Sequence, residues 1–164
     1  MTENSFNMNS FRHSIYLDKP VEEVYKYIGT GNGLTKWFIG NSVYSAGGKK
    51  RGDSEYVMKG DEFNWNWLEK DFSVSGKVLD AEVNKMFKFT FGSIFIVTIS
   101  VKAGSGRTLF TLEQEYAANT EKNDFAHINC CVCWAFFVTN LKSVIESGCD
   151  LRETQADMEE LVNR

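Results

Sequence analysis

The chain has 164 residues, of which 43% are hydrophobic and 24% are charged, and its formal net charge is −4. This length fits one domain with a sizeable core, and the composition is ordinary for a soluble globular protein. Nucleic-acid-binding proteins usually carry a strong basic excess, so we expect no nucleic-acid partner.

The N-terminal part predicts one strand followed by two short helices. The first ten residues are rich in Asn and Ser and are expected to be disordered, so a single domain spans residues 11–164. Residues 11–17 alternate as a strand does, and Pro20 then opens an amphipathic helix that ends at Gly29. Residues 34–38 predict one further helical turn.

The middle of the chain predicts a series of antiparallel strands. Apolar and polar residues alternate in 62–67, 87–91, 95–101 and 110–116. Each segment therefore has one apolar and one polar face, as in a sheet with one side in water. Glycines at 92, 104 and 106 mark turns, and Gly76 is expected at a bulge or bend.

A long helix is predicted from Asp124 onward, because apolar residues recur there at steps of four and three. They form one stripe: Cys130, Trp134, Phe137, Leu141 and Val144. A second apolar strip in the N-terminal half predicts burial nearly all round: Phe125, Ile128, Val132 and Phe136. A polar face is expected in the C-terminal half: Thr139, Asn140, Ser143 and Glu146. The sheet must therefore wrap around this helix.

Beyond Gly148 the sequence predicts a short terminal helix. Asp150 and Glu153 match a capping box, and the apolar residues that support the helix are Leu151, Met158 and Leu161. Arg152 is expected to brace this helix together with Asp150.

Of the four cysteines, those at positions 130, 131 and 133 are expected to be buried structural thiols. A zinc site usually combines two ligand clusters and only one is present, so we expect neither a metal nor a cofactor. The longest uncharged run, 125–141, is too short and too polar for a confident membrane span. With no secretory signal pattern in the first dozen residues, we expect a cytoplasmic protein.

Several motifs make the chain similar to a known family. They are residues 20–25, residues 34–38 with Trp37-Phe38, residues 76–79, residues 134–144, and then Gly148 with Asp150-Leu151-Arg152. These resemble the family named for activators of the heat-shock-protein-90 ATPase, within the StAR-related lipid-transfer and birch-pollen-allergen superfamily. The resemblance implies an α+β helix-grip fold, in which a curved antiparallel sheet wraps around a long C-terminal helix. It also implies a link to the stress response, although fold alone does not fix function.

The aromatic content suggests a ligand site between the sheet and the helix. An equally weighted alternative is that the rings fill a solid core, and the resemblance favours the cavity. The lining candidates are Trp37, Phe38, Trp65, Trp67, Phe89, Phe110, Trp134 and Phe137. Gln114 shares the apolar face of its strand and is the clearest polar residue for orienting a ligand, whereas His13 is expected to be a hydrogen-bonded core group.

Three hypotheses for function remain. The first is a non-enzymatic binding protein with an internal apolar cavity for a small lipid-like or aromatic ligand, acting as a monomer or homodimer. The second, motivated only by the family name, is a chaperone-interaction module. The third is a cyclase or hydrolase that uses the same cavity. We expect no catalytic residues, because neither a nucleophile elbow nor a paired-carboxylate motif is evident.

Overall fold

The computed structural model describes residues 6–68 and 71–154. Its helices are α1 (Val21–Ile28), α2 (Gly31–Leu34) and α3 (Asp124–Ser147). Its strands are β1 (Ser10–Leu17), β2 (Asn41–Ala46), β3 (Lys49–Lys50), β4 (Glu62–Asn66), β5 (Ser73–Glu82), β6 (Met86–Phe91), β7 (Phe95–Gly104) and β8 (Arg107–Tyr116). The predicted α+β helix-grip fold, with two short helices after the first strand, is confirmed.

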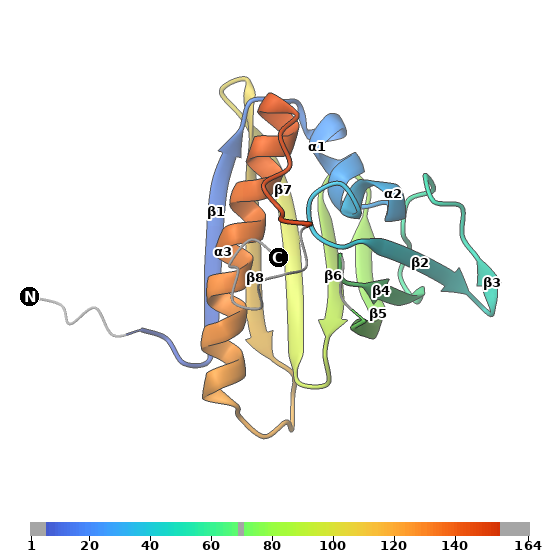
Figure 1. Cartoon of the computed structure of the whole chain (residues 1–164), viewed down its shortest axis with the longest axis vertical. Coiled ribbons are helices and arrows are strands. Elements are labelled where there is room, and N and C mark those ends of the chain that lie inside the picture. Colours follow the sequence, from blue (N-terminus) through green and yellow to red (C-terminus); the bar gives the residue numbers. More distant parts are fainter. Residues whose placement is uncertain (1–5, 69–70, 155–164) are drawn as a thin grey trace, which may run out of the picture.

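The strands form one antiparallel sheet of eight strands in the order β1-β8-β7-β6-β5-β4-β2-β3. Neighbours in the chain are neighbours in the sheet from β4 to β8, so tight turns suffice there. The N-terminal strand β1 closes the other edge against β8, with Phe11 opposite Gln114 and Leu17 opposite Thr108. In Figure 1 the sheet curves, and α3 runs across the face formed by β1, β8 and β7.

The orientation of α3 follows from its apolar stripe, as predicted. Trp134, Phe137 and Leu141 are buried, and Cys130 and Val144 pack at the margins. The prediction of burial nearly all round is wrong, because Phe125, Ile128 and Val132 are exposed, Phe125 at 80%. The sheet covers one side of the helix only, so these three residues of the second strip stay exposed, whereas the fourth, Phe136, packs against the edge of the core.

Residues at the helix ends set the lengths of the helices. At the start of α3, the side chain of Asn123 accepts a hydrogen bond from the Ala126 backbone N–H, and Gly148 ends the helix in the left-handed conformation with φ 69°. Helix α2 begins earlier than predicted, because Thr30 caps it at the N-terminus, and residues 35–38 continue as a turn.

Strands β2 and β3 and the full extent of β5 did not emerge from the alternation pattern. Gly76 does not form a bulge: it pairs in register with Phe63, and the register shift lies between Val78 and Asp80. A Cβ at Gly76 would lie 2.3 Å from the Phe63 ring and 2.8 Å from the Thr90 carbonyl oxygen. The glycine is therefore required for close packing.

The segment after α3 does not form the predicted helix within the described residues. Residues 148–154 have no regular secondary structure, and Met158 and Leu161 lie outside the described residues. By length and composition α3 meets the criterion for a membrane-crossing helix, as the core helix of a soluble protein also does. Its packing against the sheet through Trp134 and Leu141 fits the core-helix interpretation.

We predict that Gly76→Ala destabilises the protein by about 1–3 kcal/mol, because the added methyl must displace Phe63 or the Thr90 backbone. Gly104→Ala is the matched control, since a Cβ there meets no atom within 4 Å. The control should change the free energy of unfolding by less than about 0.5 kcal/mol. Urea titrations of both variants measure the difference, and equal losses would contradict the packing at Gly76.

Candidate ligand-binding site

The eight predicted lining aromatics form one connected cluster, called here the aromatic cluster. Phe38, from the turn after α2, is its centre, with ring centroids 4.6 Å from Trp134 and 5.0 Å from Phe137. The other rings reach it from the turn itself, from β4 and the residue after it, and from β6 and β8 through contacts of 5.1–6.5 Å. Two further rings join the same cluster without having been among the candidates: Phe63 and Phe91.

The aromatic cluster is closely packed in this structure. Trp37, Trp65 and Phe110 have no exposed surface, and Trp134 is 2% exposed. A side chain without accessible surface borders no space that admits a water molecule. Of the eight, only Trp67 is partly exposed, and its ring lies 5.6 Å from that of Phe72 at the surface. Any ligand must therefore enter by displacing rings.

Gln114 is the polar residue placed against this cluster. Its Oε1 accepts a hydrogen bond of 2.9 Å from Trp134 Nε1, and its side chain has no exposed surface. An indole nitrogen only donates, so the amide oxygen must face Trp134 and the amide NH₂ must point elsewhere. No partner of that nitrogen meets hydrogen-bond geometry, and the polar group beside it is the Cys130 thiol, a weak acceptor. Sequence reasoning selected Gln114 for its apolar strand face, and the structure pairs it with Trp134.

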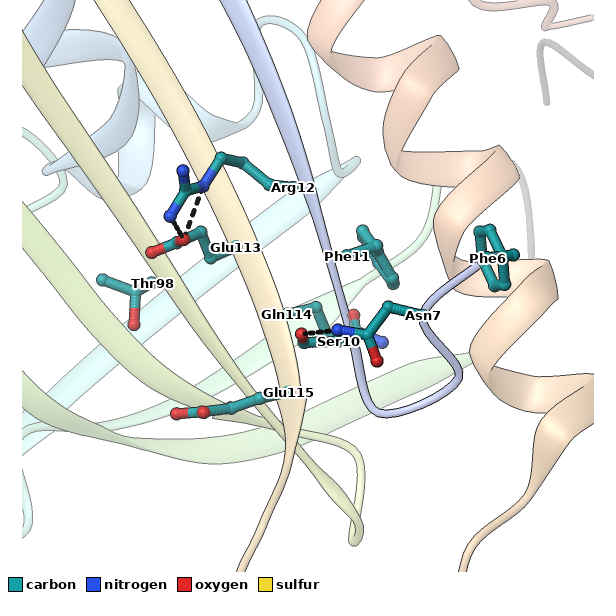
Figure 2. A pocket seen from close by; sticks show the side chains of 9 residues that line it. All are labelled: Phe6, Asn7, Ser10, Phe11, Arg12, Thr98, Glu113, Gln114 and Glu115. Carbon is teal, nitrogen blue, oxygen red and sulfur yellow. Dashed lines mark hydrogen bonds and ion pairs between the residues drawn. The ribbon is translucent and has the colours of Figure 1, made fainter. Parts of the chain in front are cut away.

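A surface hollow of about 550 Å³ borders Gln114 at the edge where β1 meets β8. In Figure 2, Phe11 and Phe6 lie on the α3 side of the sheet, whereas the ion pair of Arg12 with Glu113 lies on the opposite side. The Gln114 side chain, which has no exposed surface, thus separates the hollow from the aromatic cluster.

The two histidines occupy different surroundings. Nε2 of His13 lies 2.8 Å from the Cys131 carbonyl oxygen and, since a carbonyl only accepts, must donate to it. His127 is fully buried, bonded through Nε2 to the Asn7 carbonyl, with Nδ1 unpaired. Aromatic rings surround it: Phe6, Phe11, Phe95 and Tyr116. No pattern in the sequence predicted that His127 would lie between the helix and the edge of the sheet.

The prediction that the thiols of Cys130, Cys131 and Cys133 are buried is wrong. Cys133 and Cys149 are exposed, and Cys130 and Cys131 are partly exposed. The cause is the same one-sided cover of α3 that exposes Val132. Burial raises the pKa of the Cys130 thiol to about 11, against the opposing effect of the Gln114 amide as a hydrogen-bond donor to the sulfur. Within residues 6–68 and 71–154, no group of three His, Cys, Asp or Glu side chains is placed to hold a metal ion.

A polar network ties α3 to the turn that carries Phe38, and Asn140 is its centre. The prediction that Asn140 faces water is wrong, because its side chain is fully buried. It donates to the Trp37 carbonyl (2.8 Å) and to Asp150 (3.0 Å), and accepts from the Leu151 backbone N–H (2.8 Å). The backbone on both sides of Phe38 is thereby held against the helix.

Arg152 completes this network. Instead of bracing a terminal helix, it donates to the carbonyls of Ile39 (3.0 Å) and Thr35 (2.9 Å) and pairs with Asp150. Burial raises the pKa of the Asp150 carboxyl, but the hydrogen bonds from Arg152 and Asn140 outweigh it. The net pKa therefore lies below the ordinary value.

Comparison with known proteins assigns the chain to a family. A model of the family described as "Activator of Hsp90 ATPase homolog 1-like protein" matches residues 18–146. The chain belongs to this family. The match runs from the start of α1 through nearly all of α3, so it includes every member of the aromatic cluster. For function, membership of this family supports one coarse statement: the chain is a ligand-binding module.

Solved structures share the fold at low identity. Protein SSP2350 from Staphylococcus saprophyticus has a TM-score of 0.67 and 17% identity over 87% of this chain and 96% of its own. The Aha1 dimer from Colwellia psychrerythraea has a TM-score of 0.65 and 19% identity over 85% and 97%. DynU16, a protein of the dynemicin biosynthetic locus, has a TM-score of 0.68 and 17% identity over 89% and 50%. No curated protein matches this chain in sequence.

The Asp150 network of this Activator of Hsp90 ATPase homolog 1-like chain predicts an acid-sensitive contribution to stability. A carboxyl whose folded pKa is lowered stabilises the fold above its unfolded pKa and loses that effect as the pH falls. Asp150→Asn should therefore be less stable than the native chain at about pH 6, and the difference should shrink below about pH 4. Urea midpoints measured across this range test it, and a pH-independent difference would contradict it.

Proposed function

We propose that this chain is a non-enzymatic binding protein whose aromatic cluster takes up a small lipid-like or aromatic ligand. The observation that carries the proposal is the buried amide of Gln114: its oxygen accepts from Trp134, and its NH₂ has no partner at hydrogen-bond geometry, with only the weakly accepting Cys130 thiol beside it. Leaving a buried donor without a partner costs about 1–3 kcal/mol. A ligand with a hydrogen-bond acceptor would remove this cost and keep the surrounding rings dry.

The site of uptake is the space now filled by the rings around Phe38. Gln114 would orient the ligand. The aromatic candidates would contact it: Trp37, Phe38, Trp65, Trp67, Phe89, Phe110, Trp134 and Phe137. The hollow beside Gln114 supports an entry route at the β1–β8 edge, where the wall includes Phe11. Ligand binding would then move rings apart without moving the sheet.

The non-enzymatic part of the proposal rests on the groups beside the cluster. An amide does not titrate, so Gln114 can orient a ligand but cannot transfer protons. Nε2 of His13 is committed to the Cys131 carbonyl. Glu113 and Glu115 line the hollow, and His127 adjoins it through its bond to Asn7, so a cyclase or hydrolase would have to use one of these groups. We further propose a cytoplasmic location, with which four cysteines outside any disulfide agree.

A binding screen tests this function. Native mass spectrometry and thermal shift against palmitic acid, cholesterol and an aromatic polyketide should reveal a bound mass and a raised Tm for at least one of them. A ligand at a hundred times its Kd stabilises by about 2.7 kcal/mol, which is roughly 5–10 °C for a chain of this size.

Gln114→Met is the matched variant for that screen, because it keeps the side-chain length and removes the amide. It should weaken binding of ligands that carry an acceptor while far-ultraviolet circular dichroism stays native. No bound mass and no Tm shift with any of the three compounds would contradict the proposal. Chemical conversion of a bound compound, followed by chromatography, would replace it with the enzymatic alternative.

The exposed strip on α3 favours a second candidate, a module that binds a chaperone ATPase. Phe125, Ile128 and Val132 present an apolar face that the sheet does not cover. Replacing all three by Ser should abolish a complex with the Hsp90-class ATPase and any change in its turnover. Light scattering on the same samples reports whether this chain, like the Colwellia protein, is a dimer. Absence of a complex with the native chain removes this candidate.

A further inference from the structure

Three polar groups on the β2–β4 pair are buried without a hydrogen-bond partner: Ser42 Oγ, Tyr44 OH and Trp65 Nε1. Ser42 and Tyr44 lie two residues apart on one strand and therefore share a face. Trp65 is directly opposite Ser42 in the register of the two strands. All three side chains thus lie on one small area of the sheet.

This concentration stands out against the surrounding core. The hydroxyl of Tyr25 donates to the Met86 carbonyl, and the indole N–H of Trp37 donates to the Tyr27 carbonyl, both at 2.9 Å. Of the six unpartnered buried side-chain atoms among the described residues, three are on the β2–β4 pair and a fourth is Gln114 Nε2. Native chains pair almost all such groups, so four orphans beside one aromatic cluster need an explanation.

The chemistry of the three groups indicates what would satisfy them. An indole N–H only donates, and both hydroxyls are able to donate. Burial raises the pKa of the Tyr44 phenol far above its ordinary value, against the opposing effect of hydrogen-bonding groups on Trp65 and Ser42. The three groups therefore face one another, although no pair of them meets hydrogen-bond geometry. Tyr44 therefore keeps its proton at neutral pH. Up to three donors converge on one place, and an oxygen with two lone pairs and no proton fits them best.

The position of Trp65 connects this place to the aromatic cluster. Its ring centroid lies 5.7 Å from that of Phe38 and 5.1 Å from that of Phe89. On the side toward β2 it lies 6.3 Å from Tyr44. A flat molecule that displaced Phe38 would thus lie against Trp65, with one end at the unpaired donors.

We propose that Ser42, Tyr44 and Trp65 form a polar subsite that binds the carbonyl oxygen of an aromatic ligand held in the aromatic cluster. The inference rests on the proposed binding function and adds the class of ligand: an aromatic ketone or quinone. The Gln114 amide would supply a separate donor at the β8 side of the same ligand.

A matched pair of probes tests the subsite: 9-fluorenone, which carries a carbonyl, and fluorene, which has a methylene in its place. Equilibrium dialysis should show that the native chain binds fluorenone more tightly. Tyr44→Phe should lower the affinity for fluorenone about tenfold and that for fluorene less than twofold, as expected for one lost hydrogen bond in a dry site. Ser42→Ala should act in the same direction.

Tyr25→Phe is the control variant, because its hydroxyl has a partner outside the cluster. It should lower the Tm of the ligand-free chain and leave both affinities unchanged. Tyr44→Phe should not lower the ligand-free Tm, since the hydroxyl it removes is unpaired. A loss of Tm equal to that of Tyr25→Phe would show a structural role for Tyr44 and overturn the subsite.

The remaining outcomes separate the two proposals. If the native chain binds both probes equally and Tyr44→Phe changes neither affinity, the subsite is wrong while the binding function stands. If the native chain binds neither probe, both the subsite and the aromatic-ligand function that it rests on are contradicted.

Discussion

The contact between Trp134 and its two partners determines how the molecule is put together. One face of the indole stacks on Phe38 at 4.6 Å, and its N–H donates to Gln114 on β8. A single side chain of α3 therefore joins the helix to the sheet and to the turn after α2. Because an indole has one N–H and its direction is fixed, this also sets the rotation of α3 about its axis. Phe137 and Leu141 then face the sheet, while Phe125 faces solvent.

Around this contact, the buried polar groups are of two kinds. Those with hydrogen-bond partners form a frame around the aromatic cluster, and those inside the frame lack partners. Asn140 and Arg152 use their hydrogen bonds to hold the backbone of residues 35–39 in place. Inside the frame, the amide nitrogen of Gln114 and the donors near Trp65 have no partner at hydrogen-bond geometry. A frame of this kind keeps the fold intact while the rings between its walls rearrange. That division is the physical basis for proposing a binding protein in preference to a solid core.

The sequence predicted the fold well where periodicity was strong. The stripe through Trp134 and Leu141 identified the buried face of α3, and alternation identified β1, β4, β6, β7 and β8. It also selected eight rings that the fold brings into one cluster. Phe91 continued the same alternation as Phe89, so the signal for it was present.

Other features depend on tertiary contacts that a single sequence does not report. The strip from Phe125 to Val132 looked buried because periodicity shows which residues share a face but not whether anything covers it. Asn140 looked exposed because its partners are Trp37, far away along the chain, and Asp150, in the irregular segment after the helix. Strand β2 is short and rich in Asn and Ser, so the sequence pattern did not predict that Ser42 and Tyr44 lie beside Trp65.

The most direct test of this account is the unfolding free energy of Trp134→Ala beside that of Phe125→Ala, an aromatic truncation on the exposed side of the same helix. The packing predicts a loss of about 3–5 kcal/mol for Trp134→Ala, since a buried ring and a hydrogen bond disappear together. Phe125→Ala should change stability by less than about 0.5 kcal/mol. Similar losses for the two variants, or a larger loss for Phe125→Ala, would show that α3 does not face the sheet through Trp134.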